Sequence, residues 1–226
     1  MLWILLILFL LGLLLGPQWM VNRQMRLGDQ ERSDLKGTGG ELAKHLAERF
    51  ALEVEIEGGA SGDHYDPIAK VVRLQDKHFN GRTLSALTIA AHEMGHVIQD
   101  QQGYRPFQQR QLWAKAIMVL QRTSAILLAG GSLLLWVPGM AFVWRLLIIS
   151  ALVTGVANIL FRFLTLPVEW HASYRLALPI LADGYLPEDD LPQAERLLRA
   201  AALTYLAAAL ANLLNVGFWL RLLLRR

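Results

Sequence analysis

The sequence predicts a mostly α-helical membrane protein with about four transmembrane helices and a small α/β domain between the first and the second. Three observations support this fold class. The chain has 226 residues, of which 54% are hydrophobic, a larger share than in an ordinary soluble domain. Apolar runs of about 20 residues recur, and each is long enough to cross a bilayer as a helix. A more polar stretch after the first run shows the periodicities of short strands and helices.

The first predicted transmembrane helix comprises residues 1–21. Leu2 to Val21 carry no charge, and as a helix they would extend about 30 Å, the thickness of a bilayer core. No basic region precedes this long apolar core, so a cleaved signal peptide is disfavoured.

Residues 22–116 form the predicted α/β domain. Thr38 to Phe50 has the pattern of a helix. Glu53 to Glu57 alternates as a half-exposed strand, and Lys70 to Leu74 reads as a second short strand. The segment between them, Gly58 to Pro67, is rich in glycine and is predicted to be a turn.

The last helix of this domain is predicted at Thr83 to Gln102, with Thr83 as N-cap and Gly103 after its end. It carries His92-Glu93-Met94-Gly95-His96. Positions four apart lie on one helix face, so both histidines can bind a single metal ion. Glu93 would lie beside the ion, where it can take a proton from a water that the metal activates. The pattern predicts a metallohydrolase of the zincin-like kind, with one catalytic zinc, and most directly a protease.

The remaining apolar runs predict a hairpin of two transmembrane helices at 117–161, turning at Pro138-Gly139, and a last helix with a basic tail at 200–226. With four spans, the membrane-proximal segment 162–199 faces the same side as the zinc helix. It can therefore supply a further ligand.

A catalytic zinc needs a third protein ligand and an open position. Glu169 follows the third span directly and is the predicted ligand. His171 is a rival, but a residue two positions away points to another helix face, which favours a role beside the ligands or the substrate. Asp183, in an Asp-Gly pair, resembles a ligand motif of intramembrane site-2 proteases. Those enzymes carry their His-Glu-x-x-His in a spanning helix, whereas polar residues bound the helix here.

Strands next to a metal helix suit a protease that binds its protein or peptide substrate as an added edge strand. His64, Tyr65, His171 and Tyr174 are candidates for contacts with the substrate or the oxyanion. A turn held by the side chains of Asp63 and Asp66 explains the first two equally well, and both readings stay open.

Four segments resemble, in consistent order, the YugP-like neutral zinc metallopeptidases, which are bacterial multi-span membrane proteins. They are Asp63–Pro67, Ala90–Gln99, Leu166–Glu169 with Ala172-Ser173, and Ala200–Ala209. The resemblance implies that His92 and His96 bind zinc, that Glu93 is the catalytic acid/base and that Glu169 is the third ligand. The Glu-x-x-Ala-Ser pattern is also similar to Glu-x-x-Ala-Asp of HtpX-like membrane gluzincins, with Ser173 in place of Asp.

Composition narrows the partners and the compartment. The chain has no cysteine, which excludes disulfides, thiolate ligands and cysteine catalysis. Its net charge of +3 is explained by orientation in the lipid bilayer and predicts no nucleic acid partner. Basic residues near the span ends are more frequent on the side of the zinc helix, which predicts a multi-pass protein of the cell membrane with a cytosolic active site. These residues are Arg23, Arg26, Arg105, Arg110, Lys115, Arg162, Arg175, Arg196 and Arg199 on that side, against Arg145, Arg221, Arg225 and Arg226.

Two other function classes stay in view. One is an intramembrane site-2-type protease. The other is a catalytically inactive membrane scaffold or adaptor with a structural zinc, which would have no need of Glu93. The oligomeric state is not predicted.

Overall fold

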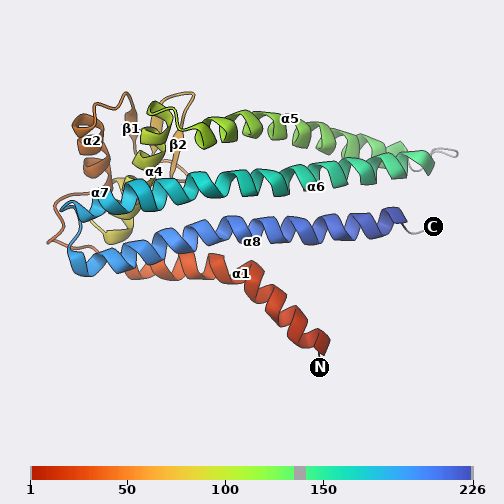
Figure 1. Cartoon of the computed structure of the whole chain (residues 1–226), viewed down its shortest axis with the longest axis horizontal. Coiled ribbons are helices and arrows are strands. Elements are labelled where there is room, and N and C mark those ends of the chain that lie inside the picture. Colours follow the sequence, from red (N-terminus) through yellow and green to blue (C-terminus); the bar gives the residue numbers. More distant parts are fainter. Residues whose placement is uncertain (1, 135–140, 225–226) are drawn as a thin grey trace.

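The computed structural model describes residues 2–134 and 141–224, and it places a small domain at one end of a bundle of long helices (Figure 1). Within the bundle, α6 packs against both α5 and α8, and α1 packs along α8. The long helices are α1 (Leu2–Gly28), α5 (Arg105–Leu134), α6 (Ala141–Trp170) and α8 (Leu191–Leu224). The mostly helical fold class predicted from the sequence is confirmed.

Three helical stretches among the described residues are long and apolar enough to cross a membrane, namely Arg105–Leu133, Phe142–Ala182 and Glu188–Arg221. The first predicted span lies in α1, which contains Pro17 and is bent (Figure 1). Several side chains near the start of α1 are outside the described set, so a fourth crossing stays a prediction. The predicted turn at Pro138-Gly139 also lies outside the described residues.

The small domain begins with α2 (Gly39–Arg49) and a three-stranded sheet. A capping box joins Thr38 to Glu41 and starts α2 at the predicted residue. The strands are β1 (Glu55–Glu57), β2 (His64–Asp66) and β3 (Val71–Arg73), in the order β1-β3-β2. Because β3 lies in the middle, parallel to β1 and antiparallel to β2, one edge of β2 is left unpaired within the sheet.

Strand β2 differs from the sequence expectation, which had only a glycine-rich turn at Gly58 to Pro67. The strand has three residues between turn-forming neighbours, too few to show an alternating pattern. Its central residue, Tyr65, is buried in the core, while His64 is exposed. Tertiary packing of Tyr65 decides that this stretch pairs with β3.

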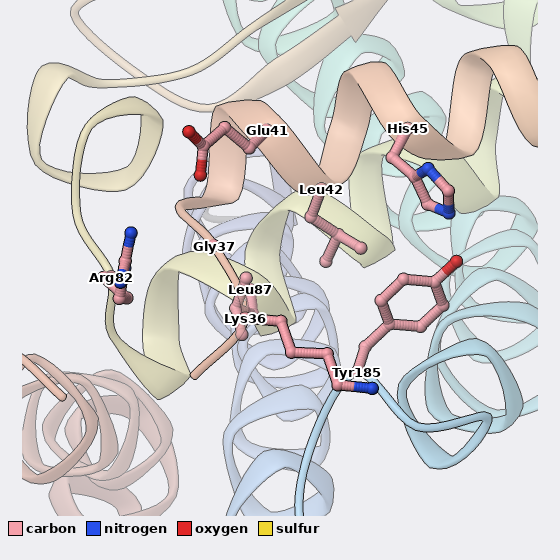
Figure 2. A pocket seen from close by; sticks show the side chains of 8 residues that line it. All are labelled: Lys36, Gly37, Glu41, Leu42, His45, Arg82, Leu87 and Tyr185. Carbon is pink, nitrogen blue, oxygen red and sulfur yellow. The ribbon is translucent and has the colours of Figure 1, made fainter. Parts of the chain in front are cut away.

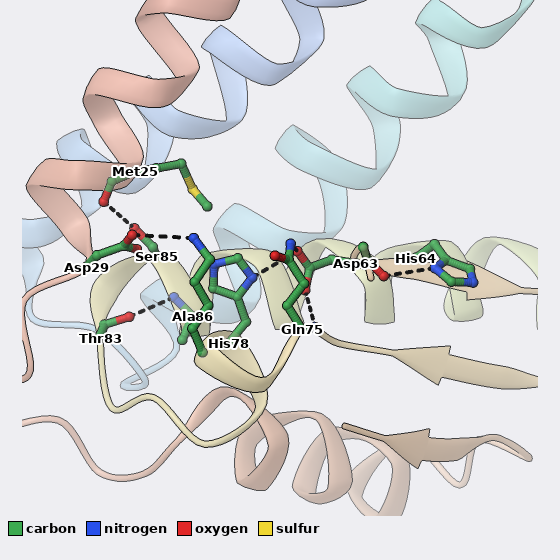
Figure 3. A network of polar contacts seen from close by, with 11 residues as sticks. Met25, Asp29, Asp63, His64, Gln75, His78, Thr83, Ser85 and Ala86 are labelled. Carbon is green, nitrogen blue, oxygen red and sulfur yellow. Dashed lines mark hydrogen bonds and ion pairs between the residues drawn. The ribbon is translucent and has the colours of Figure 1, made fainter. Parts of the chain in front are cut away.

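Helix α4 (Leu84–Gln101) follows the short α3 (Asp76–Phe79) and has the predicted ends. The hydroxyl of Thr83 accepts a hydrogen bond from the backbone N–H of Ala86 (3.1 Å), as Figure 3 shows. Gly103 has a φ of +65°, the left-handed conformation that favours glycine after a helix end. Most of α4 is buried. It packs against α2, the sheet and the helical segments that come after α6 in the chain.

Helix α6 extends beyond residue 161, where the sequence placed the end of the third span. The helix continues to Trp170 and passes directly into the π-helix η1 (His171–Ala177) and then α7 (Leu178–Ala182). The short 3-10 helix η2 (Glu188–Asp190) leads into α8. Helix α4 packs closely on η1, since a Cβ atom on Gly95 would lie 3.0 Å from the carbonyl oxygen of Ala172. This close approach brings the end of α6 to the histidines of α4.

Candidate active site

Two helices supply the candidate metal ligands, which come together as the sequence predicted. His92 and His96 lie one turn apart on α4, and Glu169 lies at the end of α6. The Oε2 atom of Glu169 is 3.2 Å from Nε2 of His92 and 3.6 Å from Nε2 of His96. The ligating atoms of all three lie within 4.8 Å of one another. Glu169 is 4% exposed, so its carboxylate is shielded from water.

Gln99 determines which nitrogen of His96 is free for a metal. Its amide nitrogen donates to the carbonyl of Val168 (2.8 Å) and lies 3.1 Å from Nδ1 of His171. The amide oxygen therefore faces His96, 3.0 Å from its Nδ1. Because that oxygen can only accept, Nδ1 of His96 carries the hydrogen and Nε2 presents its lone pair.

Ser173 makes the corresponding contact to the other histidine. Its hydroxyl lies 3.2 Å from Nδ1 of His92, which leaves Nε2 turned toward Glu169. Burial by itself disfavours the charged imidazole of His92, but the nearby carboxylates of Glu169 and Glu93 outweigh it and raise the pKa of His92. A metal at Nε2 would therefore compete with a proton for this nitrogen.

The arrangement suits a cation between the three side chains. With its hydrogen on Nδ1, His96 turns a nitrogen lone pair toward Oε2 of Glu169, and a positive charge between the two makes that juxtaposition favourable. The other oxygen, Oε1, is buried without a hydrogen-bond partner and lies 3.4 Å from Nη1 of Arg110. Two imidazoles and one carboxylate are a usual ligand set for a catalytic zinc with one open position. The residues present fit that metal.

Glu93, the predicted acid/base, lies beside this group, and its side chain borders two cavities that meet at the site. One has a volume of about 230 Å³ and the other about 120 Å³. Both are also lined by His92, Glu169 and two further residues, Asp63 and Tyr205. Glu93 is buried, so its carboxylate faces these cavities and not bulk solvent.

Of the predicted substrate contacts, two lie at the site. His64 and Tyr65 both line the smaller cavity. The hydroxyl of Tyr65 donates to Asp100 (2.7 Å), and burial together with that carboxylate raises the pKa of Tyr65. His64 is the more available of the two, since it is exposed and its Nδ1 lies 3.0 Å from the backbone carbonyl of Gly62, which leaves Nε2 open.

The other two predicted contacts lie away from the cavities. His171 is behind Gln99 and stacks on Tyr104, with ring centres 4.2 Å apart. Tyr174 packs on Trp170, with ring centres 4.3 Å apart. Neither lines either cavity at the site.

Asp183, the rival third ligand, is not part of the metal-binding group. It forms the C-cap of α7 and an ion pair with Arg49 (2.6 Å). Gly184 follows with a φ of +86°, so the Asp-Gly pair ends a helix, as turn chemistry suggests.

The segment around His64 has the carboxylate contacts that the interpretation as a turn predicted. Asp63 accepts hydrogen bonds from the backbone N–H of Gln75 (2.8 Å) and contacts Nδ1 of His78 (2.8 Å), as Figure 3 shows. Burial would raise the pKa of Asp63, but these contacts outweigh it and lower that pKa. Asp66 binds the backbone N–H groups of Ile68 and Ala69. The carboxylates hold the loops, and β2 between them presents His64 to the site.

Three residues at the site did not emerge from sequence reasoning: Gln99, Arg110 and Tyr205. Arg110 belongs to α5, in the part of the chain that the sequence assigned to the α/β domain (22–116), and Tyr205 belongs to α8, which the sequence assigned to the last span. A signal existed for Tyr205, because Thr204-Tyr205 is a polar pair within an apolar span. Only the packing of α8 on α4 shows that it borders the zinc ligands.

A separate cavity of about 410 Å³ lies between α2, the start of α4 and the turn before α8 (Figure 2). Its lining includes Glu41 and His45, but the Glu41 carboxylate accepts a hydrogen bond from the backbone N–H of Thr38 (2.8 Å). None of the metal-binding residues lines it. The candidate metal-binding group therefore lies at the smaller cavities beside Glu93.

Replacement of Gln99 by leucine should weaken zinc binding by about 10- to 100-fold, because His96 loses the acceptor that orients its ring. The measurement is a zinc dissociation constant from competition with a chelating dye. Gln102→Leu, at an exposed position of the same helix end, is the matched control and should bind zinc like the parent protein. Equal affinities in the two variants would remove the positioning role of Gln99.

Comparisons with known proteins agree with this geometry. Residues 2–224 match the model of a family described as "putative neutral zinc metallopeptidase". The chain is 32% identical to "Putative membrane protease YugP" of Bacillus subtilis (strain 168) over 219 residues, 96% of this chain and 94% of that protein. No solved structure matches. The family match extends over nearly the whole chain, so this protein belongs to the neutral zinc metallopeptidase family that the sequence motifs indicated.

Proposed function

We propose that the protein is a membrane-bound, zinc-dependent endopeptidase. The observation that carries this proposal is the buried carboxylate of Glu169 facing two Nε2 atoms, with the carboxylate of Glu93 one residue from His92. Purely structural zinc sites use all four positions and need no free carboxylate beside the metal. Two cavities border Glu93 and differ in their further lining residues, which leaves room for a substrate chain at the cleaved bond.

A zinc ion held by the three ligands would activate a water molecule and polarise the substrate carbonyl. Glu93 accepts a proton from the attacking water at its carboxylate as the new C–O bond forms. It then returns that proton to the amine nitrogen as the C–N bond breaks, so one water is consumed for each bond cleaved. The hydroxyl of Tyr205 and the ring of His64, which both line the smaller cavity, are the candidate donors for the oxygen that becomes negative.

Strand β2 is the part of the sheet that suits substrate binding. It lies at the sheet edge and lines the smaller cavity through His64 and Tyr65. An extended peptide that pairs with the open edge of β2 would pass the metal-binding group. The backbone supplies the affinity in this mode, and the cavities supply the selectivity.

The two alternatives receive less support. An intramembrane protease would carry its metal helix within the bilayer, but α4 is not among the candidate spans found in the described residues. Its ends at Thr83 and Gln102 lie within the small domain. A scaffold with a structural zinc would leave Glu93 without a role, although this carboxylate borders both cavities.

Metal removal tests the proposed function. Detergent-purified protein should contain about one zinc per chain and cleave members of a peptide library. Treatment with a chelator should abolish cleavage, and added zinc should restore it in proportion to the metal bound. Cleavage that persists in protein shown to be free of metal would contradict the proposal.

We also propose that the active site faces the cytosol, on the basis of the basic residues near its span ends. With four spans, both chain ends lie on the opposite side. Reporter fusions after Arg226 and within the exposed loop at Ile68 should then report opposite sides, with Ile68 cytosolic. A cytosolic reporter after Arg226 would remove the four-span topology.

A further inference from the structure

The two cavities that meet at Glu93 have different walls. The larger is enclosed mainly by apolar side chains of α4 and α8, whereas the smaller carries a cation and several polar groups. Beyond the residues that both share, the larger is lined by Thr88, Ile89, Leu197, Leu198, Ala201 and Thr204. The smaller is lined by His64, Tyr65, His96, Phe107, Arg110 and Gln111. A peptide that crosses the site would therefore meet different environments on the two sides of its scissile bond.

The wall from α8 is a regular stripe of one helix face. Its residues stand at positions 197, 198, 201, 204 and 205, the spacing of neighbours on one side of an α-helix. The opposite wall comes from Thr88 and Ile89, one turn before His92 and Glu93 on α4. The metal-binding group is thus at one end of an apolar slot between two helices.

We infer that this slot is a specificity subsite that takes a large apolar side chain adjacent to the scissile bond. The inference rests on the proposed peptidase function and adds a substrate class to it, namely segments with residues such as leucine or phenylalanine. A slot of about 230 Å³ has room for one such side chain, and transfer of that side chain from water is favourable. A polar side chain there would lose its hydrogen bonds to water against Ile89 and Leu197.

The subsite lies on a helix that is a candidate membrane span. The residues of the stripe belong to the stretch Glu188–Arg221, one of the candidate spans. The apolar slot is consequently built on a helix that continues into the bundle. A segment that leaves the bilayer is rich in the side chains that this slot accommodates.

Ala201 allows a direct test, because it is the smallest side chain in the stripe. Ala201→Phe should fill the slot and lower the ratio of kcat/KM for leucine over alanine peptides by roughly tenfold or more, since each methylene in an apolar pocket contributes about that factor. Ile89→Ala, on the opposite wall, should enlarge the slot. It should therefore raise the ratio of kcat/KM for tryptophan over leucine peptides. The peptides vary one residue at a time on each side of the cleaved bond.

Ala211→Phe is the matched control, at an exposed position of the same helix. It should keep the preference of the parent protein. The inference is overturned if the parent protein shows no apolar preference on either side of the bond, or if Ala201→Phe and Ile89→Ala both leave the preference unchanged while binding zinc. If the zinc-loaded parent protein cleaves no peptide at all, both the inference and the proposed function fail. Cleavage without an apolar preference would overturn the inference alone.

Discussion

Glu93→Gln is expected to lower peptide hydrolysis by roughly 10²- to 10⁴-fold, because the amide cannot accept the proton of the attacking water. The glutamine side chain has nearly the same shape, and the three ligating atoms of His92, His96 and Glu169 do not include Glu93. Zinc content should therefore stay at the level of the parent protein. The measurement combines kcat/KM on a cleaved library peptide with metal analysis of the same sample.

A matched control separates the loss of the proton acceptor at Glu93 from the mere loss of one negative charge. Glu188→Gln removes one carboxylate at η2, away from both cavities at the site, and should retain the activity of the parent protein. Zinc-loaded Glu93→Gln protein that hydrolyses peptides at the parent rate would remove Glu93 from the mechanism. Loss of both zinc and activity would instead assign Glu93 to metal binding.

Glu169→Ala has the second large expected effect, on metal affinity. Removal of one of three protein ligands should weaken zinc binding by more than about 100-fold, since loss of a group that merely orients a ligand already costs about 10- to 100-fold. Activity at limiting zinc should fall in parallel. Arg110 would also lose the carboxylate 3.4 Å from its guanidinium, so the thermal stability of the metal-free protein reports that separate contribution.

Asp183→Ala is the control, because Asp183 was the rival ligand in the sequence. It breaks a largely exposed ion pair with Arg49 and should leave zinc affinity unchanged. Full zinc occupancy in Glu169→Ala, or a loss of zinc in Asp183→Ala, would reverse the assignment of the third ligand.

Much of the fold could be predicted from local sequence patterns. The limits of α4 followed from Thr83 and Gly103, because caps are decided by residues adjacent to the helix end. Strand β2 was not accessible, since three residues cannot establish a period and the pairing with β3 depends on burial of Tyr65. The extension of α6 past 161 was missed because hydropathy reports an apolar run and not where a helix continues into a domain.

The candidate site, like the fold, could be predicted from the sequence only in part. His92, Glu93 and His96 were readable because a helix converts a spacing of four residues into a shared face. Glu169 was reached by topology, and the structure brings it to within 3.6 Å of both histidines. The roles of Gln99 and Tyr205 were not readable, because they depend on contacts between helices that are far apart in the chain.

The sequence by itself determined the mostly helical class with apolar runs long enough to span a membrane and the helix with its two histidines, because composition and short-range periodicity carry that information. The neutral zinc metallopeptidase family followed from the resemblance of its motifs. Only the tertiary structure decided which groups surround these histidines: Gly95 permits η1 to approach α4, and the packing of α8 closes an apolar slot beside Glu93. The physical reason is that close packing and hydrogen bonding act between surfaces. Those surfaces meet only when the chain has folded.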